Sequence, residues 1–366
     1  MRSWQALAMV AMVAGCASEQ GIYGGVDPDG AGTELGGPDD GRPGDDDDDW
    51  NASTDPIVEA GAVEGRVCAP DGETYLSLAT VTVLTDYGNV TGLTDGEGYF
   101  LIDAVPVGTW PIIVEKGSFS VSHEVTIEAG QRTSLATEVC VPLDPSTVDI
   151  AVVTGSYDSI EDVLDVLAID YTLVNGRSGT QHVGLLRDPA ALAQYDILFL
   201  NCGMGEQWRD HQAEVAANLK EFVQNGGSIY ASDWAYYLVE ATWPARNDFH
   251  GDDGVFGDAA VGDMGKVDAT LLDAAMIELM GQGTARLNFD LGMWVAMSDV
   301  GADAEVLLEG TYQWSNFYGG GGGQAHGPLA TRLHDGLGTA VFTSFHNERQ
   351  ATDDMAKLLQ EIILSL

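Results

Sequence analysis

Basic residues are scarce in this sequence. Its 366 residues include 15 lysines and arginines against 57 aspartates and glutamates, which gives a formal net charge of −42. Because the phosphate backbone of nucleic acids repels so acidic a chain, nucleic-acid binding is excluded on electrostatic grounds. The sequence also lacks an internal repeat, and after its first residues it has no apolar run long enough to span a membrane. These absences leave an acidic chain with room for two domains and a tether.

A short apolar run over residues 7–13 follows the positive charge of Arg2. It is too short for a permanent membrane helix and is typical of a secretory signal. Residues 13–16, Val-Ala-Gly-Cys, resemble the bacterial lipobox, in which the cysteine is lipidated. The resemblance implies a signal peptide over residues 1–16, a membrane anchor on Cys16 and, since alanine rather than aspartate follows, the outer membrane of a double-membraned bacterium. The alternative is an ordinary cleaved signal in which Cys16 has no role.

Residues 17–58 are rich in Gly, Asp, Pro, Ser and Thr and contain almost no aliphatic side chains. Such a segment cannot bury enough apolar surface to offset the entropy of ordering, so we expect a disordered acidic linker. The aspartates at 45–49 could collect divalent cations weakly, although a solvated charge run is the simpler interpretation. The linker would hold the folded part away from the membrane.

Residues 59–145 change to short alternating strands divided by turn residues, which predicts an all-β sandwich. Residues 94–100, Thr-Asp-Gly-Glu-Gly-Tyr-Phe, together with residues 105–110, Val-Pro-Val-Gly-Thr-Trp, resemble the carboxypeptidase regulatory-like domain. The resemblance implies a transthyretin-like sandwich that serves as a scaffold and brings no catalytic residues. Cys68 and Cys140 lie near the two ends of this segment, and in an exported protein we expect a disulfide between them. The alternative is a pair of buried thiols.

Residues 146–366 alternate between strands and helices, which predicts a parallel sheet covered on both faces. We expect strands over 149–154, 195–201, 228–231 and 338–344, and helices over 159–169, 212–224 and 355–366. Asp158 or Ser159 would cap the first helix. The expected architecture is therefore a multi-domain chain with an all-β sandwich followed by an α/β domain.

Two motifs of the α/β segment resemble the class I glutamine amidotransferase-like superfamily. One is the strand at 195–201 that leads into Cys202 and Gly203, and the other is residues 341–348, Val-Phe-Thr-Ser-Phe-His-Asn-Glu. The resemblance implies a flavodoxin-like, doubly wound parallel sheet. It also implies a cysteine nucleophile at a sharp strand-to-helix turn, completed by a histidine and a glutamate, here His346 and Glu348.

The nucleophile position of that turn holds an aspartate. The turn needs small residues two before and two after the nucleophile, and Ala231 and Ala235 place Asp233 between them. Ser232 is the nearby hydroxyl, but Trp234 occupies one of its flanks and is too large. Thiol-dependent glutamine hydrolysis is therefore not available. Cys202 lies on the earlier strand, where a buried and inert cysteine is the usual outcome.

We expect Asp233, His346 and Glu348 to meet at the carboxyl ends of the strands, where open α/β sheets bind ligands. The surrounding pocket would be lined by four further residues: Cys202, Gly203, Ser232 and Trp234. Three interpretations stay open: a structural hydrogen-bond network, a small-ligand or metal pocket, and hydrolysis by a nucleophile other than cysteine. A carboxylate beside His346 favours the protonated imidazole, which cannot act as a general base, and this favours binding over catalysis.

Weaker signals lie elsewhere in the α/β segment. Asp248, His250, Asp252 and Asp253 cluster oxygen ligands that suit calcium, although their spacing matches no EF-hand and a solvated loop is the alternative. A set of tryptophans could line a carbohydrate surface or fill the core: Trp208, Trp234, Trp243, Trp294 and Trp314. The glycines at 319–323 indicate a mobile hinge or lid.

Together these patterns predict a lipid-anchored protein of the cell envelope that binds a small molecule, a glycan or a protein, and that is not an enzyme. The competing prediction is a hydrolase that uses the crevice around Asp233 and His346 with a non-cysteine nucleophile or a metal. A purely structural envelope module is the third.

Overall fold

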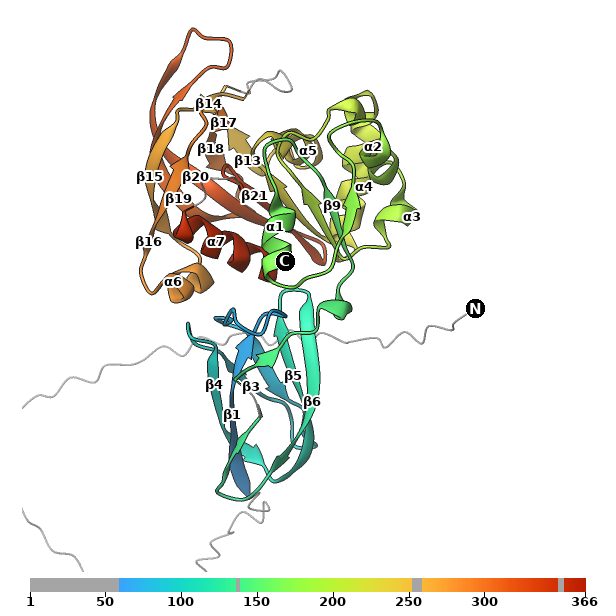
Figure 1. The fold of residues 1–366 in the computed structure, drawn as a ribbon, viewed down its shortest axis with the longest axis vertical. Coiled ribbons are helices and arrows are strands. Elements are labelled where there is room, and N and C mark those ends of the chain that lie inside the picture. Colours follow the sequence, from blue (N-terminus) through green and yellow to red (C-terminus); the bar gives the residue numbers. More distant parts are fainter. Residues whose placement is uncertain (1–58, 136–138, 252–258, 348–351) are drawn as a thin grey trace, which may run out of the picture. The chain divides into compact units, whose positions relative to one another are not determined.

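The computed structural model describes residues 59–135, 139–251, 259–347 and 352–366. These residues form a mixed, strand-rich, multi-domain structure with several sheets (Figure 1). The expected lipidation site Cys16 and the expected linker lie outside the described residues, as do Asp252, Asp253 and Glu348.

Residues 59–142 form two four-stranded sheets. In one, β1 pairs with β4, β7 and β8; in the other the order is β3-β2-β5-β6. The strands are β1 Ala60–Cys68, β2 Thr80–Val83, β3 Val90–Leu93, β4 Tyr99–Pro106, β5 Gly108–Lys116, β6 Phe119–Ile127, β7 Arg132–Ser134 and β8 Val141–Pro142. Buried residues alternate with partly buried ones along β2 and with exposed ones at the start of β4, so each of these strands packs one face inward.

The disulfide expected from the sequence is confirmed. Cys68, at the end of β1, is bonded to Cys140, just before β8, and the two residues are 72 apart in sequence. Both side chains are buried. The bond therefore ties the first strand of this region to its last one.

Residues 150–343 contain five parallel strands in the order β10-β9-β11-β12-β21. They are β9 Ile150–Val153, β10 Thr172–Val174, β11 Ile197–Leu200, β12 Ser228–Ser232 and β21 Gly338–Thr343, with helices α1 Ile160–Val166, α2 Gln181–Leu186, α3 Pro189–Leu192, α4 Gln212–Gln224, α5 Tyr236–Thr242 and α7 Asp353–Leu364. The helix expected at 212–224 is confirmed as α4.

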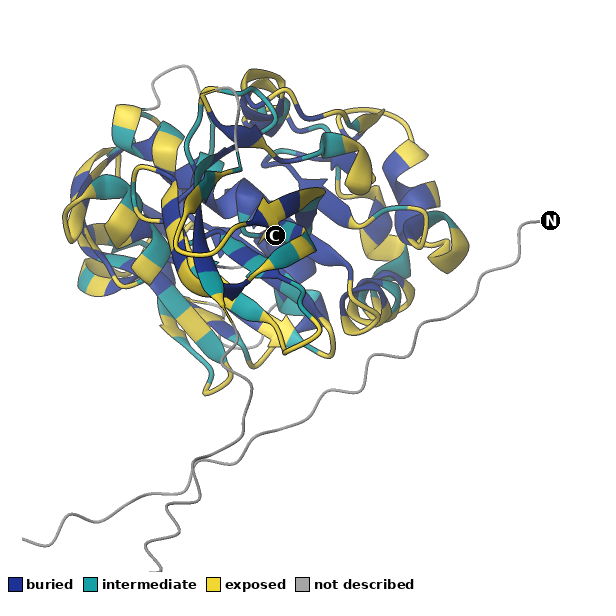
Figure 2. Ribbon diagram, turned by 90° about the horizontal axis from the view of Figure 1, so that it is seen from below, coloured by how far each residue is buried: buried dark blue, intermediate teal, exposed yellow. Residues whose placement is uncertain are grey.

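Helices cover both faces of these parallel strands, as expected. Val152 and Phe199 belong to one buried cluster together with residues of α1 and α7. Their neighbours Ala151 and Leu198 belong to a second buried cluster with residues of α4 and α5. Successive residues of a strand point to opposite faces, so each strand contributes to both clusters. Figure 2 shows the central strands in dark blue and the outer helices with yellow outward faces.

The sheet is not parallel throughout, and here the sequence expectation was wrong. Beyond β21 it continues through antiparallel strands, with β20 and β19 next in order. The further strands of this sheet are β14 Val261–Gly262, β15 Gly265–Leu271, β16 Thr284–Phe289, β17 Trp294–Val295, β19 Ala304–Ser315 and β20 Gly322–Asp335, with helix α6 Ala274–Met280 between β15 and β16 in the chain. Strands β13 Asn247–Phe249 and β18 Met297–Val300 pair with each other in a separate two-stranded sheet.

The glycine run at 319–323 explains one of these antiparallel pairs. Instead of a hinge or lid, it closes the β19–β20 hairpin, in which Ser315 is paired with Gly322. Gly319 and Gly320 have φ values of 81° and 94°, a left-handed backbone that glycine adopts without strain. A connection this short cannot cross over to a parallel strand, so the two strands must run antiparallel.

A buried ion pair connects the sandwich strands to the last helix. Lys116 at the end of β5 lies 2.5 Å from the Glu361 carboxylate of α7, and both side chains are buried. Lys116 Nζ also donates to the Ser77 carbonyl at 2.8 Å.

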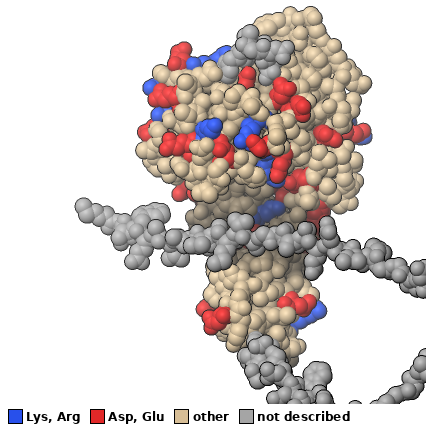
Figure 3. All heavy atoms as spheres, turned by 180° about the vertical axis from the view of Figure 1, so that it is seen from behind, with Lys and Arg blue, Asp and Glu red and all other residues tan. Residues whose placement is uncertain are grey.

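No helix among the described residues is long and apolar enough to cross a membrane. On the face seen in Figure 3, lysines and arginines lie among carboxylates.

Candidate functional site

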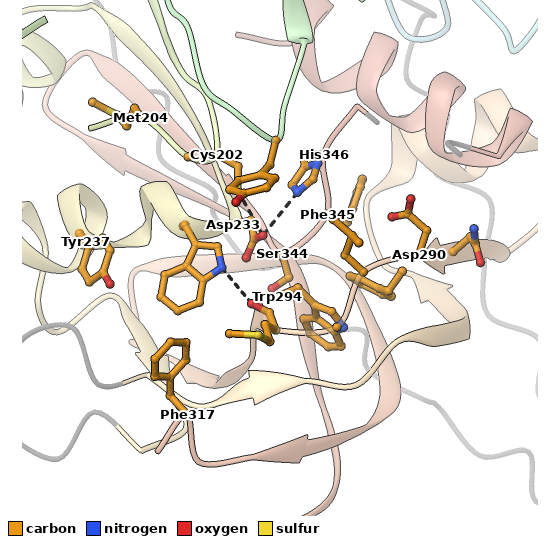
Figure 4. Close-up of a pocket in the computed structure, with 18 of the residues that line it drawn as sticks. Cys202, Met204, Asp233, Tyr237, Asp290, Trp294, Phe317, Ser344, Phe345 and His346 are labelled. Carbon is orange, nitrogen blue, oxygen red and sulfur yellow. Dashed lines mark hydrogen bonds and ion pairs between the residues drawn. The ribbon is translucent and has the colours of Figure 1, made fainter. Parts of the chain in front are cut away.

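A cavity of about 590 Å³ lies where the parallel strands β11, β12 and β21 end. This is the edge of an open α/β sheet at which ligands bind, and the volume falls within the usual range of small-molecule sites. Polar side chains of its lining include Cys202, Glu206, Asp233, Asn288, Asp290, Ser344 and His346, and the aromatic ones are Tyr157, Trp234, Tyr237, Phe289, Trp294, Phe317 and Phe345 (Figure 4).

Asp233 occupies a strained turn at the end of β12. Its φ is 44°, in the left-handed region that non-glycine residues rarely adopt, and only 4% of its surface is exposed. Ala231 and Ala235, two residues away on either side, are both buried. The structure thus places Asp233 at the turn where the sequence register expects it, with the small flanking residues that the turn requires.

Both carboxylate oxygens of Asp233 have partners. Oδ1 accepts a hydrogen bond from the Val295 backbone N–H at 2.7 Å. Oδ2 accepts one from the Cys202 thiol at 3.3 Å and lies 3.4 Å from Nε2 of His346. Figure 4 shows His346 and Asp233 pointing toward one another. The protein therefore holds this carboxylate in a fixed orientation.

Cys202 is 1% exposed and follows β11. Burial, and then the charge of Asp233, raise the pKa of the Cys202 thiol well above its ordinary value. A thiol that stays protonated is a poor nucleophile, which agrees with the expectation of an inert cysteine. The same side chain nevertheless lines the cavity and donates to Asp233.

Asp158 organises the residues behind the cavity, and sequence reasoning missed this role. Its Oδ2 accepts a hydrogen bond from Ser232 Oγ at 2.5 Å, and its Oδ1 accepts one from the Asn347 backbone N–H at 3.1 Å. Ser232 Oγ in turn accepts from the Cys202 backbone N–H at 3.0 Å. Burial raises the pKa of Asp158 to about 6, and the charge of His346 opposes that rise.

One carboxylate thus links the immediate neighbours of Asp233 and His346, and through Ser232 it reaches Cys202. The sequence offered Asp158 as a helix cap. In the structure the N-cap of α1 is Ser159, and Asp158 is only 2% exposed. No local sequence signal distinguishes a capping aspartate from a buried one.

The aromatic wall of the cavity comes largely from segments outside the parallel strands. Trp234 Nε1 donates to the Met293 carbonyl at 2.8 Å, and its ring lies 5.5 Å from that of Phe317 in the β19–β20 turn. Trp294 stacks on Phe289 with ring centroids 4.1 Å apart. Trp234 was expected here, whereas Phe289 and Phe317 were not, because the sequence did not predict that their segments return to the sheet edge.

Of the remaining predicted pocket residues, some line the cavity and others do not. Gly203 lines the cavity, whereas Ser232 is fully buried behind it and does not. Among the tryptophans considered for a carbohydrate surface, Trp208 and Trp243 are buried core residues outside the cavity lining. Trp314 stacks on the ring of His250 at 4.5 Å.

The calcium candidates do not gather into a described metal-ligating group. Asp248 is exposed on β13, and burial lowers the pKa of His250, whose ring lies against Trp314. Among the described residues, the group whose ligand atoms come together is Cys202, Asp233 and His346, with one atom of each within 4.8 Å of the others.

Comparisons with known proteins assign no family. No family model matches the chain, and no curated protein matches it. A cytoplasmic protein from Salmonella typhimurium is similar in structure, with 12% identity, a TM-score of 0.37, and coverage of 59% of this chain and 97% of that one. A β-galactosidase from Bacillus circulans has 15% identity and a TM-score of 0.31, and the match covers 60% of this chain and 30% of that one. Likenesses this weak carry no argument about fold or function.

Proposed function

We propose that this protein is a lipid-anchored envelope protein that binds a small ligand in the cavity above Asp233, on an amidotransferase-like scaffold without a nucleophilic thiol. The strand order β10-β9-β11-β12-β21 supports the scaffold, because numbering the parallel strands along the chain gives 2-1-3-4-5, the flavodoxin-like order. The sandwich of residues 59–142 would serve as a spacer of the carboxypeptidase regulatory-like type.

The observation that supports binding most strongly is that both carboxylate oxygens of Asp233 already contact other groups of the protein. The position that would hold a cysteine nucleophile holds a carboxylate instead, with Val295 on one oxygen and Cys202 and His346 on the other. The thiol that is present stays protonated, because burial raises the pKa of Cys202. Amide hydrolysis through a thiolate therefore has no nucleophile at this turn.

The lining of the cavity favours an uncharged, sugar-like ligand. It includes the carboxylates of Glu206, Asp233 and Asp290, and no lysine or arginine belongs to the described lining, so an anionic ligand would be repelled. The carboxylates can accept hydrogen bonds from hydroxyl groups. The ring of Trp234, which is only partly buried, offers a flat apolar surface for the less polar face of a sugar ring.

Ligand titration with matched probes tests this function. We expect cellobiose or chitobiose to change the tryptophan fluorescence of the full chain, and glucuronate to have no effect. Trp234→Ala should abolish the response, and Trp110→Ala, in the sandwich strand β5, should retain it. Equal binding of glucuronate, or a full response in Trp234→Ala, would contradict the proposal.

Hydrolysis with Asp233 as the nucleophile is the second candidate. It is favoured by the strained backbone of Asp233 and by His346 at 3.4 Å. The carboxylate would attack the acyl carbon of an ester or amide to form a mixed anhydride, the alcohol or amine would leave with a proton from His346, and water would then hydrolyse the anhydride and restore the carboxylate. Turnover of an ester or amide that disappears in both Asp233→Asn and His346→Gln would establish this function in place of simple binding.

The anchor is tested separately, by fractionation of cells. We expect Cys16→Ser to move the protein from the membrane to the soluble fraction, because the thiol that carries the acyl chains is gone. Cys202→Ser is the matched control and should stay with the membrane. If Cys16→Ser also remains in the membrane fraction, the lipoprotein assignment is wrong.

A further inference from the structure

We propose that Cys202, Asp233 and His346 form a three-ligand site for a zinc-like divalent ion at the floor of the cavity. One ligand atom of each residue lies within 4.8 Å of the other two. The site goes beyond the proposed ligand binding, because the ion would bind without any organic ligand.

The spacing of these atoms fits tetrahedral coordination. With Zn–S near 2.3 Å and Zn–N and Zn–O near 2.0 to 2.1 Å, the edges of a zinc tetrahedron are about 3.3 Å between N and O and about 3.5 Å between S and O. The observed separations are 3.4 Å from His346 Nε2 to Asp233 Oδ2 and 3.3 Å from Cys202 Sγ to the same oxygen. Two edges of the tetrahedron are thus close to their required lengths.

The ligand types select the metal. A thiolate and an imidazole suit zinc and cobalt, whereas calcium and magnesium take sets of oxygen ligands. A Cys thiolate and an Asp carboxylate together carry two negative charges, which a divalent ion balances. Asp248 and His250, the described members of the predicted calcium group, do not belong to this three-residue group.

The fourth coordination position would face the cavity. Cys202, Asp233 and His346 all belong to its lining, so water or a ligand atom can reach the ion from the cavity side. Three protein ligands with one open position are the arrangement of reactive rather than purely structural zinc sites. A hydroxyl or carbonyl oxygen of the bound molecule could occupy that position.

Other residues already hold the three ligands in place. The Val295 N–H binds the second oxygen of Asp233 at 2.7 Å and fixes the orientation of the carboxylate. Asp158 binds Ser232 and Asn347, the chain neighbours of Asp233 and His346. Such outer contacts orient metal ligands before the ion arrives.

Binding exchanges a proton for the ion. In the structure the Cys202 thiol keeps its proton and donates a hydrogen bond to Asp233. When the ion binds, the S–H bond breaks, the proton passes to solvent, and the sulfur donates its electron pair to the metal. A proton held on His346 Nε2 passes to solvent in the same way, so that this nitrogen donates its lone pair to the ion. No electron is transferred to or from the ion.

The test uses Co²⁺ alone as the probe, on the full chain purified in detergent. A Cys16→Ser background leaves Cys202 as the one cysteine outside the disulfide. We expect one equivalent of Co²⁺ and a thiolate-to-cobalt charge-transfer band that Zn²⁺ removes. Cys202→Ser should abolish the band, and Asp233→Asn and His346→Gln should each weaken binding by at least about tenfold, since even outer-shell losses reach that range.

Two controls separate this site from adventitious binding to the acidic surface. Met204→Leu, in the same cavity, and His250→Gln, outside the three-ligand group, should both keep the band and the affinity. If a variant fails to fold, the parent protein provides the test: bound Zn²⁺ should protect the Cys202 thiol from an alkylating reagent. Absence of the band in the parent, or its survival in Cys202→Ser, would overturn the proposal whatever the sugar titration shows.

Discussion

The two folded regions use cysteine in opposite ways. In the sandwich, Cys68 and Cys140 are bonded and buried, and neither belongs to the cavity lining. In the α/β region, Cys202 keeps a thiol and meets Asp233 at the cavity. The first arrangement adds stability, whereas the second places a thiol with a raised pKa beside a buried carboxylate at the cavity. Perturbed pKa values gather at functional sites more often than in packed cores.

Buried charge divides the regions in the same way. The buried charged residue of the described sandwich is Lys116, and its charge is balanced by Glu361 at 2.5 Å. The α/β region buries Asp158 and Asp233, and Asp158 accepts a hydrogen bond from Ser232, which directly precedes Asp233. No lysine or arginine belongs to the described cavity lining. One region neutralises its buried charge, and the other leaves an excess of negative charge for a ligand or an ion to meet.

The largest effect should come from breaking the disulfide. Replacing both Cys68 and Cys140 by alanine removes a covalent link across 72 residues, which we expect to lower the free energy of unfolding by about 4 kcal/mol. Chemical denaturation measures this loss. Cys202→Ala, the matched loss of a buried cysteine, should cost about 1 kcal/mol. Equal losses in the two variants would remove the distinction between the regions.

The next effect should come from the buried pair that joins the regions. Lys116→Met leaves the Glu361 carboxylate buried without its cation, and we expect a loss of about 3 kcal/mol in unfolding free energy. The double variant Lys116→Met with Glu361→Leu should recover most of it, because no uncompensated charge remains. Thermal or denaturant unfolding measures both.

An exposed pair provides the control for that experiment. Arg286 lies 2.7 Å from Asp268, and both side chains are largely exposed to solvent. Arg286→Ala should therefore change stability by less than about 1 kcal/mol. A loss as large as that of Lys116→Met would mean that burial does not determine how much the Lys116–Glu361 pair contributes to the free energy of unfolding.

A smaller effect should appear as a pH dependence that Asp158 causes. Its pKa is about 6 in the folded protein and 3.8 in the reference state, so the folded form retains a proton between these values that the unfolded form has released. The stabilising contribution is therefore complete below pH 4 and is lost as the pH rises to 6. Asp158→Asn should lack this loss, and its stability relative to wild type should rise by roughly 2 to 3 kcal/mol between pH 4 and 7. Parallel pH profiles of the two proteins would contradict this.

The sequence predicts those parts of the structure that local patterns determine. Helix α4 and the parallel strands follow from apolar periodicity, and Asp233 follows from the spacing of Ala231 and Ala235. The contacts that complete the site are different. Val295 lies 62 residues from Asp233, and Asp158 lies 74 residues from Ser232. No local pattern encodes a contact over such separations, and the short strands from β13 to β18 carried too weak a signal to reveal the turn that brings Val295 back.

The antiparallel extension has a consequence for how the protein could diversify. Chain segments between β13 and β20 supply Phe289, Trp294 and Phe317 to the cavity, whereas Cys202, Asp233 and His346 come from the ends of the parallel strands. These three aromatic residues and the polar floor are therefore encoded by different stretches of the gene, although Trp234, which also lines the cavity, directly follows Asp233. Substitutions or insertions in the extension can change what the cavity accepts while the floor is inherited unaltered, so relatives with this architecture should vary most between residues 288 and 318.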